Sequence, residues 1–337
     1  MTRIAINGFG RIGRAVAKIA LKKDDLELVA INDLTSIKTL AHLFKYDSVY
    51  RKYVGDVKAS DQGIIVDGKL IKVLSERSPA NLPWKELGID IAVESTGIFA
   101  TASSERGGYK DHIKAGAKKV LLTVPAKDKI DQTIVLGVNG DELDISNDAF
   151  SNASCTTNCL SPVAKVLNDN FVIEKGLMTT IHAFTNDQVV HDMPHSDLRR
   201  SRSCSSSIIP TTTGATRAVG LVIPDLLGKM DGCAMRVPII TGSLVDFVAI
   251  LKKDVTVQEI NDAVKKAAEG QFKGVLEYTE DPIVSVDIIQ NTHSSIFDAL
   301  STMVVGGNFV KVVSWYDNEW GYSNRVVELL AKIGEKL

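Results

Sequence analysis

Cysteine is scarce in this sequence, with four residues in a chain of 337. Small domains held together by disulfides use cysteine much more densely, so a disulfide framework is excluded and a reducing compartment is expected. Long hydrophobic runs are absent as well, because no stretch approaches the about 18 apolar residues of a membrane-spanning helix. The N-terminal "MTRIAINGFGRIG" also lacks the pattern of a secretory signal peptide. We therefore expect a cytoplasmic protein with no membrane association.

An excess of charge of one sign is missing too. Lys and Arg number 39 against 41 Asp and Glu, which gives a net charge of −2. No overall basic field favours nucleic acid as the primary ligand. Hydrophobic residues make up 45% and charged residues 24%, an ordinary globular balance. The length favours two domains over one large α/β unit.

The first 150 residues alternate short apolar runs with helical patterns. Strands are predicted at 3–7, 26–32, 89–96, 118–125 and 132–138, helices at 11–23 and 38–46, and a hairpin around Asp67-Gly68 at 63–74. Near-continuous apolar strands that alternate with helices are typical of a parallel sheet covered on both faces. The sequence therefore predicts an α/β domain here.

The second half has longer strands and fewer helices. Strands are predicted at 176–185, 234–240, 244–253, 283–289 and 309–317, and helices at 159–169, 211–220, 256–269 and 325–336. This pattern favours an α+β domain with a largely antiparallel sheet. The polar stretch 186–207 has no period and is longer than most loops, and such loops are often functional.

Three glycines near the N-terminus follow the spacing G-x-G-x-x-G. Gly8, Gly10 and Gly13 lie between a predicted strand and a predicted helix, and Asp33 ends the next strand. This context is the one that a dinucleotide-binding Rossmann domain requires. Gly8 permits the tight turn, Gly10 lets the backbone approach a pyrophosphate, and Gly13 allows close packing of helix on strand. A tight turn that binds nothing is the alternative.

The helix that follows and the acidic residue refine the expected ligand. Arg11 and Ile12 begin the helix, whose N–H groups and positive dipole end suit phosphates. Asp33 can accept hydrogen bonds from both ribose hydroxyls of NAD but repels the 2′-phosphate of NADP. NAD is therefore the expected cofactor.

Two cysteines stand four residues apart in "SNASCTTNCLSP" (151–162). A zinc site is a poor interpretation because no second ligand pair follows, so we expect no metal. A disulfide across one helical turn would be strained. Cys155 lies in the first helical turn, where unpaired N–H groups are expected to lower the pKa of a thiol, whereas Cys159 is predicted to be a buried core thiol. Pro162 predicts a late start or a kink. Simple packing of two small residues remains the alternative to a nucleophile.

A thiol nucleophile needs a base and an oriented substrate. Among the six histidines, His182 follows a predicted strand within "TTIHAFTNDQ" and is well placed to open onto a cleft. "PTTTGAT" (210–216) offers hydroxyls and a glycine at a helix start, which suits an anion. Arg199, Arg200 and Arg202 either join such a site or form a solvated or subunit-facing cluster.

Together the motifs resemble the glyceraldehyde-3-phosphate dehydrogenase family from residue 3 to about 330. The resemblance is carried by "INGFGRIGR", "SNASCTTNC", "TTIHAFTNDQ", "PHSDLRRSR", "IIPTTTGA", "MRVP" and "SWYDNEWGYSNR". It implies an NAD-binding domain at 1–154, joined by a C-terminal helix at 319–337, and a catalytic domain at 155–318. It also implies a homotetramer with the loop 186–207 at a subunit interface.

The resemblance assigns roles residue by residue. It implies that Cys155 is the nucleophile and His182 its activating partner in the oxidation of glyceraldehyde 3-phosphate to 1,3-bisphosphoglycerate, with NAD reduction and inorganic phosphate as second substrate. The cofactor-contacting positions are Gly8, Gly10, Arg11, Ile12, Gly13, Asp33, Arg77, Thr123 and Asn318. The positions that hold the substrate phosphate and inorganic phosphate are Ser154, Thr156, Thr185, Arg200, Thr213, Gly214 and Arg236.

Some segments depart from the family pattern, and other functions compete. Residues 239–243 and 189–196 are atypical, which leaves the local loop conformation and the interface open. An erythrose-4-phosphate dehydrogenase and an NADP-preferring form are the enzymatic alternatives, and Pro194 in the loop argues against NADP as Asp33 does. A non-enzymatic binding role is the alternative from another class, and the intact set of site residues opposes it.

Overall fold

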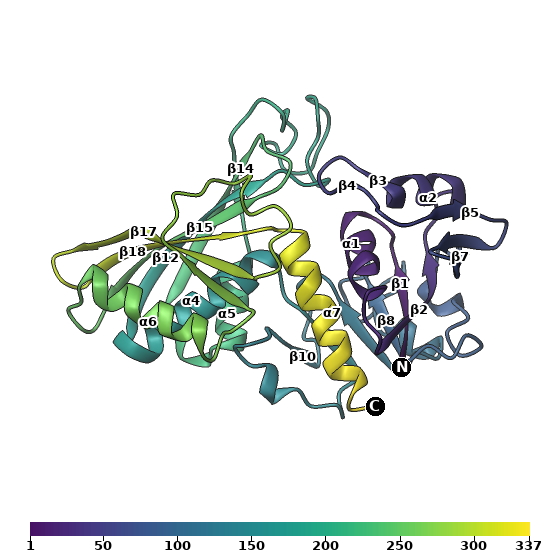
Figure 1. The fold of residues 1–337 in the computed structure, drawn as a ribbon, viewed down its shortest axis with the longest axis horizontal. Coiled ribbons are helices and arrows are strands. Elements are labelled where there is room, and N and C mark those ends of the chain that lie inside the picture. Colours follow the sequence, from purple (N-terminus) through teal and green to yellow (C-terminus); the bar gives the residue numbers. More distant parts are fainter. The chain divides into compact units, whose positions relative to one another are not determined.

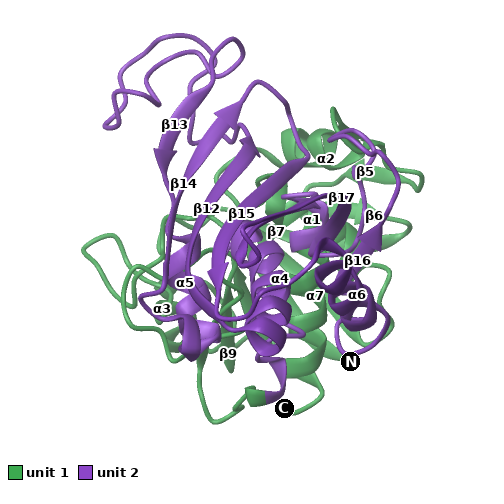
Figure 2. Cartoon of the chain, turned by 90° about the vertical axis from the view of Figure 1, so that its left-hand side faces the viewer, with its two compact units in different colours: residues 1–134, 142–153, 323–337 green, residues 135–141, 154–322 purple.

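The computed structural model describes residues 1–337 and divides them into two compact units (Figure 1, Figure 2). Unit 1 contains residues 1–134, 142–153 and 323–337, and unit 2 contains residues 135–141 and 154–322. The predicted domain bounds remain a prediction, and the compact units differ from them chiefly in placing 135–141 with the second unit. No helix is both long and apolar enough to cross a membrane.

Unit 1 is built on a nine-stranded sheet with the order β10-β11-β9-β8-β1-β2-β7-β6-β5. Its strands are β1 (Thr2–Asn7), β2 (Leu26–Asn32), β5 (Val57–Ala59), β6 (Gly63–Val66), β7 (Lys69–Leu74), β8 (Ile91–Glu94), β9 (Lys119–Leu122), β10 (Gln132–Thr133) and β11 (Ala149–Ser151). The strands from β10 to β7 are parallel, and β6 and β5 continue the sheet antiparallel. The predicted α/β class and the hairpin at 63–74 are confirmed.

The helices of unit 1 include α1 (Arg11–Ala20), α2 (Ile37–Lys45) and the short α3 (Asp111–Lys114), and β3 (Tyr46–Asp47) pairs with β4 (Arg51–Lys52) apart from the main sheet. Strand β1 lies between β2 and β8, so the chain moves to one side of β1 and then to the other. Ligands of open parallel sheets bind at the carboxyl ends of the strands at such a switch point. The glycine-rich turn that follows β1 lies at this point.

Unit 2 is built on a seven-stranded sheet with the order β13-β14-β12-β15-β18-β17-β16. Its strands are β12 (Ile173–Ala183), β13 (Ile209–Thr212), β14 (Met230–Val237), β15 (Ser243–Leu251), β16 (Leu276–Thr279), β17 (Ser295–Val305) and β18 (Phe309–Tyr316). Only the pairs β12–β14 and β16–β17 are parallel, so the predicted, largely antiparallel sheet is confirmed.

Three helices pack on one face of this sheet. They are α4 (Cys155–Phe171), α5 (Ala215–Val222) and α6 (Val257–Glu269). Helix α6 begins with a capping box in which Thr256 and Glu259 satisfy each other's backbone N–H groups. A last helix, α7 (Trp320–Gly334), follows β18. The polar stretch 186–207 contains no strand or helix, as predicted.

Two predicted elements need correction, and two strands were not predicted. Residues 283–289 form turns instead of a strand, because the Asp287 carboxylate accepts the Val284 N–H at 2.8 Å and closes a turn. The predicted strand at 132–138 ends at Thr133. Beyond it the Val135 N–H donates to Asn139 Oδ1 at 2.8 Å. The sequence reasoning missed β16 and β17, which lie before and after residues 283–289 in the chain.

Helix α4 also differs from expectation. It begins at Cys155, which confirms the prediction that this residue lies in the first helical turn, and it runs through Pro162 to Phe171, so the late start predicted from Pro162 is wrong. Ser154 compensates at the start, because its side chain caps the first turn. Pro162 has no N–H to donate to the preceding turn of the helix. The neighbouring Ser161 adds a side-chain hydrogen bond to that turn, because its Oγ donates to Thr157 O at 2.7 Å.

Candidate active site

The glycine-rich turn after β1 has the shape that a pyrophosphate requires. Gly8 has φ +91°, and a Cβ there would lie 2.7 Å from Thr96 N. A Cβ on Gly13 would collide with Gly8 O, so only glycine lets α1 pack this closely on the turn. At Gly10 nothing lies within 4 Å of the Cβ position, and this residue starts α1 without a side-chain cap. The first turn of α1 is therefore open to an anion.

Asp33 is fixed at the carboxyl end of β2 by two backbone amides. Its Oδ2 accepts from Phe9 N at 2.8 Å, and its Oδ1 accepts from Thr35 N at 2.9 Å. Each carboxylate oxygen keeps a lone pair for a further donor. The carboxylate is thus held in a fixed orientation beside the glycine-rich turn.

The other predicted cofactor positions of unit 1 share this edge of the sheet. Arg77 is exposed shortly after β7, and Thr123 is buried directly after β9. Thr123 bonds through its N–H and its hydroxyl to Glu94 O, at 3.0 and 3.2 Å. The structure therefore brings Gly8, Asp33, Arg77 and Thr123 to the carboxyl ends of neighbouring parallel strands.

Asn318 belongs to unit 2, where its amide is held in one orientation. Its Oδ1 accepts from Ser243 Oγ at 2.9 Å and from Gly242 N at 3.2 Å. The amide NH₂ is consequently the side left to act as donor. Gly242 has φ +86°, and a Cβ there would collide with Ser285 O, so this glycine is required by the turn. The atypical segment 239–243 thus contributes the turn that orients Asn318, a link that sequence reasoning missed.

The predicted nucleophile and base meet within unit 2. Cys155 is the first residue of α4, and Ser154 Oγ accepts from Thr157 N at 3.0 Å. His182 lies near the end of β12 and is 4% exposed. The distance between Cys155 Sγ and His182 Nε2 is 3.5 Å, which is hydrogen-bond range for sulfur. The two elements therefore form a thiol–imidazole pair.

The other ring nitrogen of His182 has two partners of opposite kind. Nδ1 lies 2.7 Å from Ala183 O, which can only accept, and it also meets Arg236 Nη1, which can only donate. Nε2 faces the thiol and is the nitrogen in position to act as a base. Arg236 pairs with His182 across β12 and β14 and donates through Nη1 to the same carbonyl at 3.0 Å.

Burial sets the charge state of this pair. It lowers the pKa of His182 to about 3, with the Arg236 cation as second cause, so the imidazole is neutral near pH 7. Burial also raises the pKa of the Cys155 thiol, although the Arg236 charge and the Thr156 amide oppose the rise. The expectation that the helix start gives a net decrease of this pKa is therefore wrong. The pair is a neutral thiol beside a neutral base.

Cys159 is a different kind of thiol. Its side chain is fully buried, and its Sγ lies 3.6 Å from both Ser295 Oγ and Ser314 O. Burial raises its pKa to about 12. The prediction of a buried core thiol at this position is confirmed.

The predicted phosphate-holding residues lie on the loop and helix starts of unit 2. Arg200 Nε donates to Thr211 Oγ1 at 3.0 Å, and its Nη1 pairs with Asp187. Gly214 precedes α5 without a side-chain cap, and Thr213 Oγ1 accepts from Ala215 N at 3.2 Å. Burial is the chief cause that lowers the pKa of Arg236, and the charge of Arg200 lowers it further. The two cations therefore lie close enough to repel each other.

Two family models match this chain. Residues 2–102 match the family model described as "Glyceraldehyde 3-phosphate dehydrogenase, NAD binding domain", and residues 154–318 match the model of the C-terminal domain. The chain belongs to the glyceraldehyde-3-phosphate dehydrogenase family. It is 60% identical over 334 residues to the glyceraldehyde-3-phosphate dehydrogenase of Borreliella burgdorferi, covering 98% of this chain and 99% of that protein.

Two further relatives carry the same name. The glyceraldehyde-3-phosphate dehydrogenases of Priestia megaterium and Geobacillus stearothermophilus are each 56% identical over 335 residues, covering 99% of this chain and 98% of theirs. NAD is thus the cofactor of the first domain, as predicted. The glycine-rich turn and Asp33 fit that cofactor through the open first turn of α1 and the oriented carboxylate.

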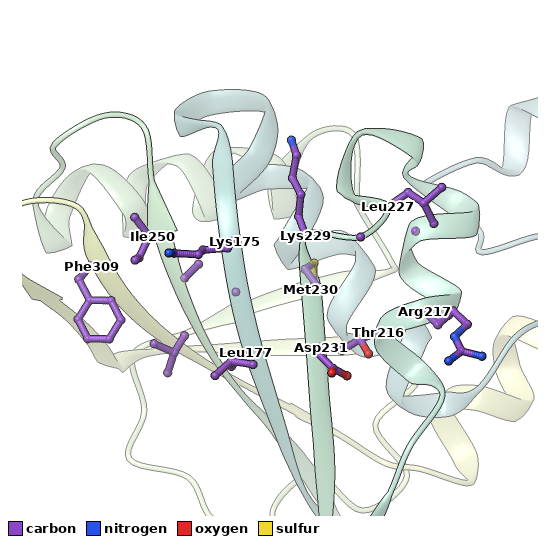
Figure 3. Close-up of a pocket in the computed structure, with 15 residues that line it drawn as sticks. Lys175, Leu177, Thr216, Arg217, Leu227, Lys229, Met230, Asp231, Ile250 and Phe309 are labelled. Atoms are coloured by element: carbon purple, nitrogen blue, oxygen red, sulfur yellow. The ribbon is translucent and has the colours of Figure 1, made fainter.

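A hollow on the sheet of unit 2 is distinct from this site. A cavity of about 870 Å³ lies over the sheet and is lined by Leu177, Met230, Ile250 and Phe309 among others (Figure 3). None of the predicted site residues lines it. The predicted nucleophile, base and Arg236 lie instead at the ends of α4, β12 and β14.

One buried residue beside the thiol–imidazole pair was missed. The Tyr316 ring meets the His182 ring edge to face, with centroids 5.8 Å apart. Its hydroxyl lies 2.8 Å from Thr156 Oγ1 and 2.8 Å from Thr180 Oγ1. The signal was present, because Tyr316 stands within "SWYDNEWGYSNR", but no spacing rule links it to residues 136 and 160 positions earlier.

Proposed function

We propose that the protein is an NAD-dependent, phosphorylating glyceraldehyde-3-phosphate dehydrogenase that forms 1,3-bisphosphoglycerate in glycolysis and gluconeogenesis. The observation that carries the proposal is the pairing of Cys155 and His182 at 3.5 Å. Family membership over nearly the whole chain supports the substrate, because the relatives bear this name.

The first step is attack of the Cys155 sulfur on the aldehyde carbon. His182 Nε2 takes the thiol proton as the C–S bond forms, and the product is a thiohemiacetal. The Cys155 N–H and the imidazole then stabilise the oxygen on which charge develops. Since the thiol is neutral at rest, its proton leaves during the attack instead of before it. NAD, when bound, supplies the hydride acceptor for the oxidation that leaves a thioester on Cys155, and the proton that His182 took from the thiol leaves to solvent.

Inorganic phosphate then attacks the thioester carbonyl. A C–O bond forms, the C–S bond breaks, and the proton of hydrogen phosphate returns to the sulfur by way of His182. Residues that we propose to hold the two phosphate groups are Ser154, Thr156, Thr185, Arg200, Thr213, Gly214 and Arg236. Their support is the start of α5 at Gly214, which has no side-chain cap, together with the half-buried cations Arg200 and Arg236.

The cofactor contacts of this proposal are assigned residue by residue. In unit 1 we assign the pyrophosphate to the turn residues Gly8, Gly10, Arg11, Ile12 and Gly13. Asp33, Arg77 and Thr123 would contact the adenosine side of the cofactor and the part of it that lies along the carboxyl edge of the sheet. In unit 2 the oriented NH₂ of Asn318 would donate to the nicotinamide carboxamide. Asp33 and Pro194 favour NAD over NADP.

We further propose a cytoplasmic homotetramer in which the loop 186–207 lies at a subunit interface. Exposed apolar side chains on the sheet of unit 2 support an oligomer, since Leu177 is 66% and Phe309 46% exposed in the single chain. The absence of net positive charge opposes nucleic acid as primary ligand.

The direct test follows NADH absorbance with glyceraldehyde 3-phosphate, NAD and phosphate. We expect absorbance to rise only when all three are present. No signal from folded, reduced protein would reject the enzyme and favour a binding role. Comparing kcat/KM for glyceraldehyde 3-phosphate and erythrose 4-phosphate, each with NAD and NADP, then decides substrate and cofactor together.

A further inference from the structure

A buried carboxyl group at the end of β8 makes four hydrogen-bonding contacts. Glu94 is fully buried, and its Oε2 accepts from Asn7 Nδ2 at 2.6 Å and lies 3.0 Å from His112 Nε2. Its Oε1 accepts from Thr96 N at 2.8 Å and also from the Thr96 hydroxyl. Burying a carboxylate costs free energy unless donors surround it, so the direction of each contact matters.

On one side this network is anchored by a backbone N–H. Glu76 N donates to Asn32 Oδ1 at 2.8 Å, so the Asn32 amide turns its NH₂ toward Asn7. Asn32 Nδ2 donates to Asn7 Oδ1 at 2.7 Å, which leaves the Asn7 NH₂ to face Glu94. Because a backbone N–H can only donate, neither amide can turn over without bringing two donors or two acceptors face to face.

On the other side the network is anchored by an indole N–H. Trp84 Nε1 donates to His112 Nδ1 at 3.0 Å, and both side chains are fully buried. Since the indole can only donate, Nδ1 must accept, and the proton of the neutral ring lies on Nε2. His112 therefore donates to Glu94 Oε2. All four contacts bring donors to Glu94, which identifies the group as a carboxylate.

The members of this network stand next to the residues that we assign to the cofactor. Three of them each directly precede such a residue in the chain: Asn7 before Gly8, Asn32 before Asp33, and Glu76 before Arg77. Asn7, Asn32 and Glu94 also end β1, β2 and β8, which are neighbouring strands at the switch point of the sheet. The network therefore cross-links the strand ends that carry the cofactor residues.

The glycine-rich turn is held most closely at Gly8. A Cβ on Gly8 would lie 2.7 Å from Thr96 N, which is the N–H that Glu94 holds. Ser95 N donates to Asn7 O, and Ser95 Oγ donates to Gly8 O, both at 2.8 Å. Residues 94–96 and the turn are thus joined at several points, so a shift of one shifts the other.

We propose that the Glu94 carboxylate is a positioning residue that holds the cofactor edge of unit 1 in its binding arrangement before NAD arrives. This inference rests on the proposed function, which assigns Gly8, Asp33 and Arg77 to the cofactor. A prearranged site binds more tightly, because the ligand does not have to order it. Loss of the carboxylate should therefore appear in the affinity for NAD and not in the chemistry at Cys155.

Two substitutions break the network at different points. Glu94→Gln is close to isosteric and replaces one acceptor oxygen by an NH₂ donor. In one orientation this NH₂ faces Asn7 and His112, and in the other it faces Thr96 N, so a donor meets a donor either way. Asn32→Ala leaves Glu94 in place and removes the link between Asn7 and the Glu76 backbone.

Two controls separate positioning from stability. Glu86→Gln removes an exposed acid of the same unit. Ile64→Ala leaves a cavity at a buried position of β6, so it should lower the free energy of unfolding without touching the network. A purely structural role of Glu94 predicts that Glu94→Gln and Ile64→Ala behave alike.

The first measurement is the dissociation constant of NAD for the full chain, by titration calorimetry without substrate. Glu94→Gln and Asn32→Ala should each bind NAD about tenfold or more weakly, the scale of one unsatisfied buried polar group. Both controls should keep the parent constant. At saturating NAD the kcat of the two network variants should stay near that of the parent, so the kinetic change lies in the KM of NAD.

A second readout needs no cofactor. Amide hydrogen exchange of the segment 7–13, which contains the glycine-rich turn, reports how firmly the turn is held. Without NAD this segment should exchange faster in Glu94→Gln and Asn32→Ala than in the parent and both controls. General destabilisation would instead speed exchange throughout unit 1, and in Ile64→Ala as well.

The outcomes are distinct. Unchanged NAD constants in both network variants would overturn the positioning role, and NADH formation by the parent would still leave the proposed function intact. An equal loss of affinity in Ile64→Ala would overturn it as well, because stability alone would then explain the effect. No binding of NAD to the folded parent would instead reject the cofactor contacts of the proposed function. If Glu94→Gln fails to fold, Asn32→Ala decides by the same two readouts.

Discussion

The Cys155 sulfur and His182 Nε2 lie 3.5 Å apart, although 27 residues of chain separate the two positions. One belongs to the first turn of α4 and the other to the end of β12, so the sheet of unit 2 and the helix that covers it create the pair. Burial raises the pKa of the Cys155 thiol and lowers that of His182 to about 3, so in the proposed mechanism the base acts at the moment of attack. The pair is therefore poised without carrying a permanent buried charge.

The two cysteines of α4 should differ sharply when replaced. Cys155→Ser is expected to abolish NADH formation, because an alcohol is a far weaker nucleophile than a thiol beside the same base. Cys159→Ser should keep most activity, since this sulfur contacts Ser295 and backbone carbonyls instead of the site. Both variants should still bind NAD, which quenching of protein fluorescence by NAD titration measures. Equal loss of activity in the two variants would refute the assignment.

His182 should make the free energy of unfolding depend on pH. Its pKa is about 3 in the folded chain and near the ordinary 6.5 in the unfolded chain. Above pH 6.5 neither state binds the proton, so the neutral histidine contributes its full stability there. As pH falls from 6.5 toward 3, only the unfolded chain binds the proton, and stability falls by up to about 1.4 kcal/mol per pH unit.

The test of that dependence is urea unfolding between about pH 7 and pH 5. His182→Gln should show a shallower loss of stability with acid than the parent chain. His191→Gln is the matched control, because His191 is exposed in the loop 186–207. The same acid slope in all three proteins would contradict a neutral, buried His182.

The sequence predicted those parts of the fold that local chemistry dictates. Asp67-Gly68 specified its hairpin because both residues take positive φ, 49° and 82°. The strand expected at 283–289 failed for a local reason as well, since the Asp287 side chain competes for the backbone of its own segment. Apolar alternation alone could not reveal that competition.

The site was predictable in its residues but less so in its energetics. Cys155 and His182 could be named from motifs, but the sign of the pKa shift could not, because desolvation depends on how deeply tertiary packing covers the thiol. The roles of Ser243 and Gly242 in orienting Asn318 were equally hidden. Contacts between residues about 75 positions apart arise only when β15 pairs with β18.

Asp33 should control the choice between the two nicotinamide cofactors. Asp33→Asn removes the negative charge but keeps one oxygen for Phe9 N, so the glycine-rich turn should survive. We expect the KM of NAD to rise by about tenfold or more, the scale of a charge-assisted hydrogen bond, and use of NADP to improve. Steady-state kinetics with both cofactors measure this. Asp24→Asn, at an exposed acid of the same unit, should change neither constant.

Arg236 should influence the nucleophile by its charge before any substrate binds. Burial is the larger cause of both pKa shifts, raising the pKa of Cys155 and lowering that of His182. The Arg236 guanidinium lowers both pKa values by charge interaction. In Arg236→Gln the Cys155 pKa should therefore rise further, and alkylation by iodoacetamide at neutral pH should slow. The full pH profile of alkylation, followed by mass spectrometry, should move to higher pH.

The same substitution should also weaken substrate binding, which separates the two roles of Arg236. Loss of a charge-assisted contact to a phosphate predicts a decrease of about 10- to 100-fold in kcat/KM. Arg202→Gln is the control, because Arg202 pairs with Asp192 at 2.8 Å on the exposed loop and should alter neither the alkylation profile nor kcat/KM. An alkylation profile that Arg236→Gln leaves in place would show that its charge does not reach the sulfur.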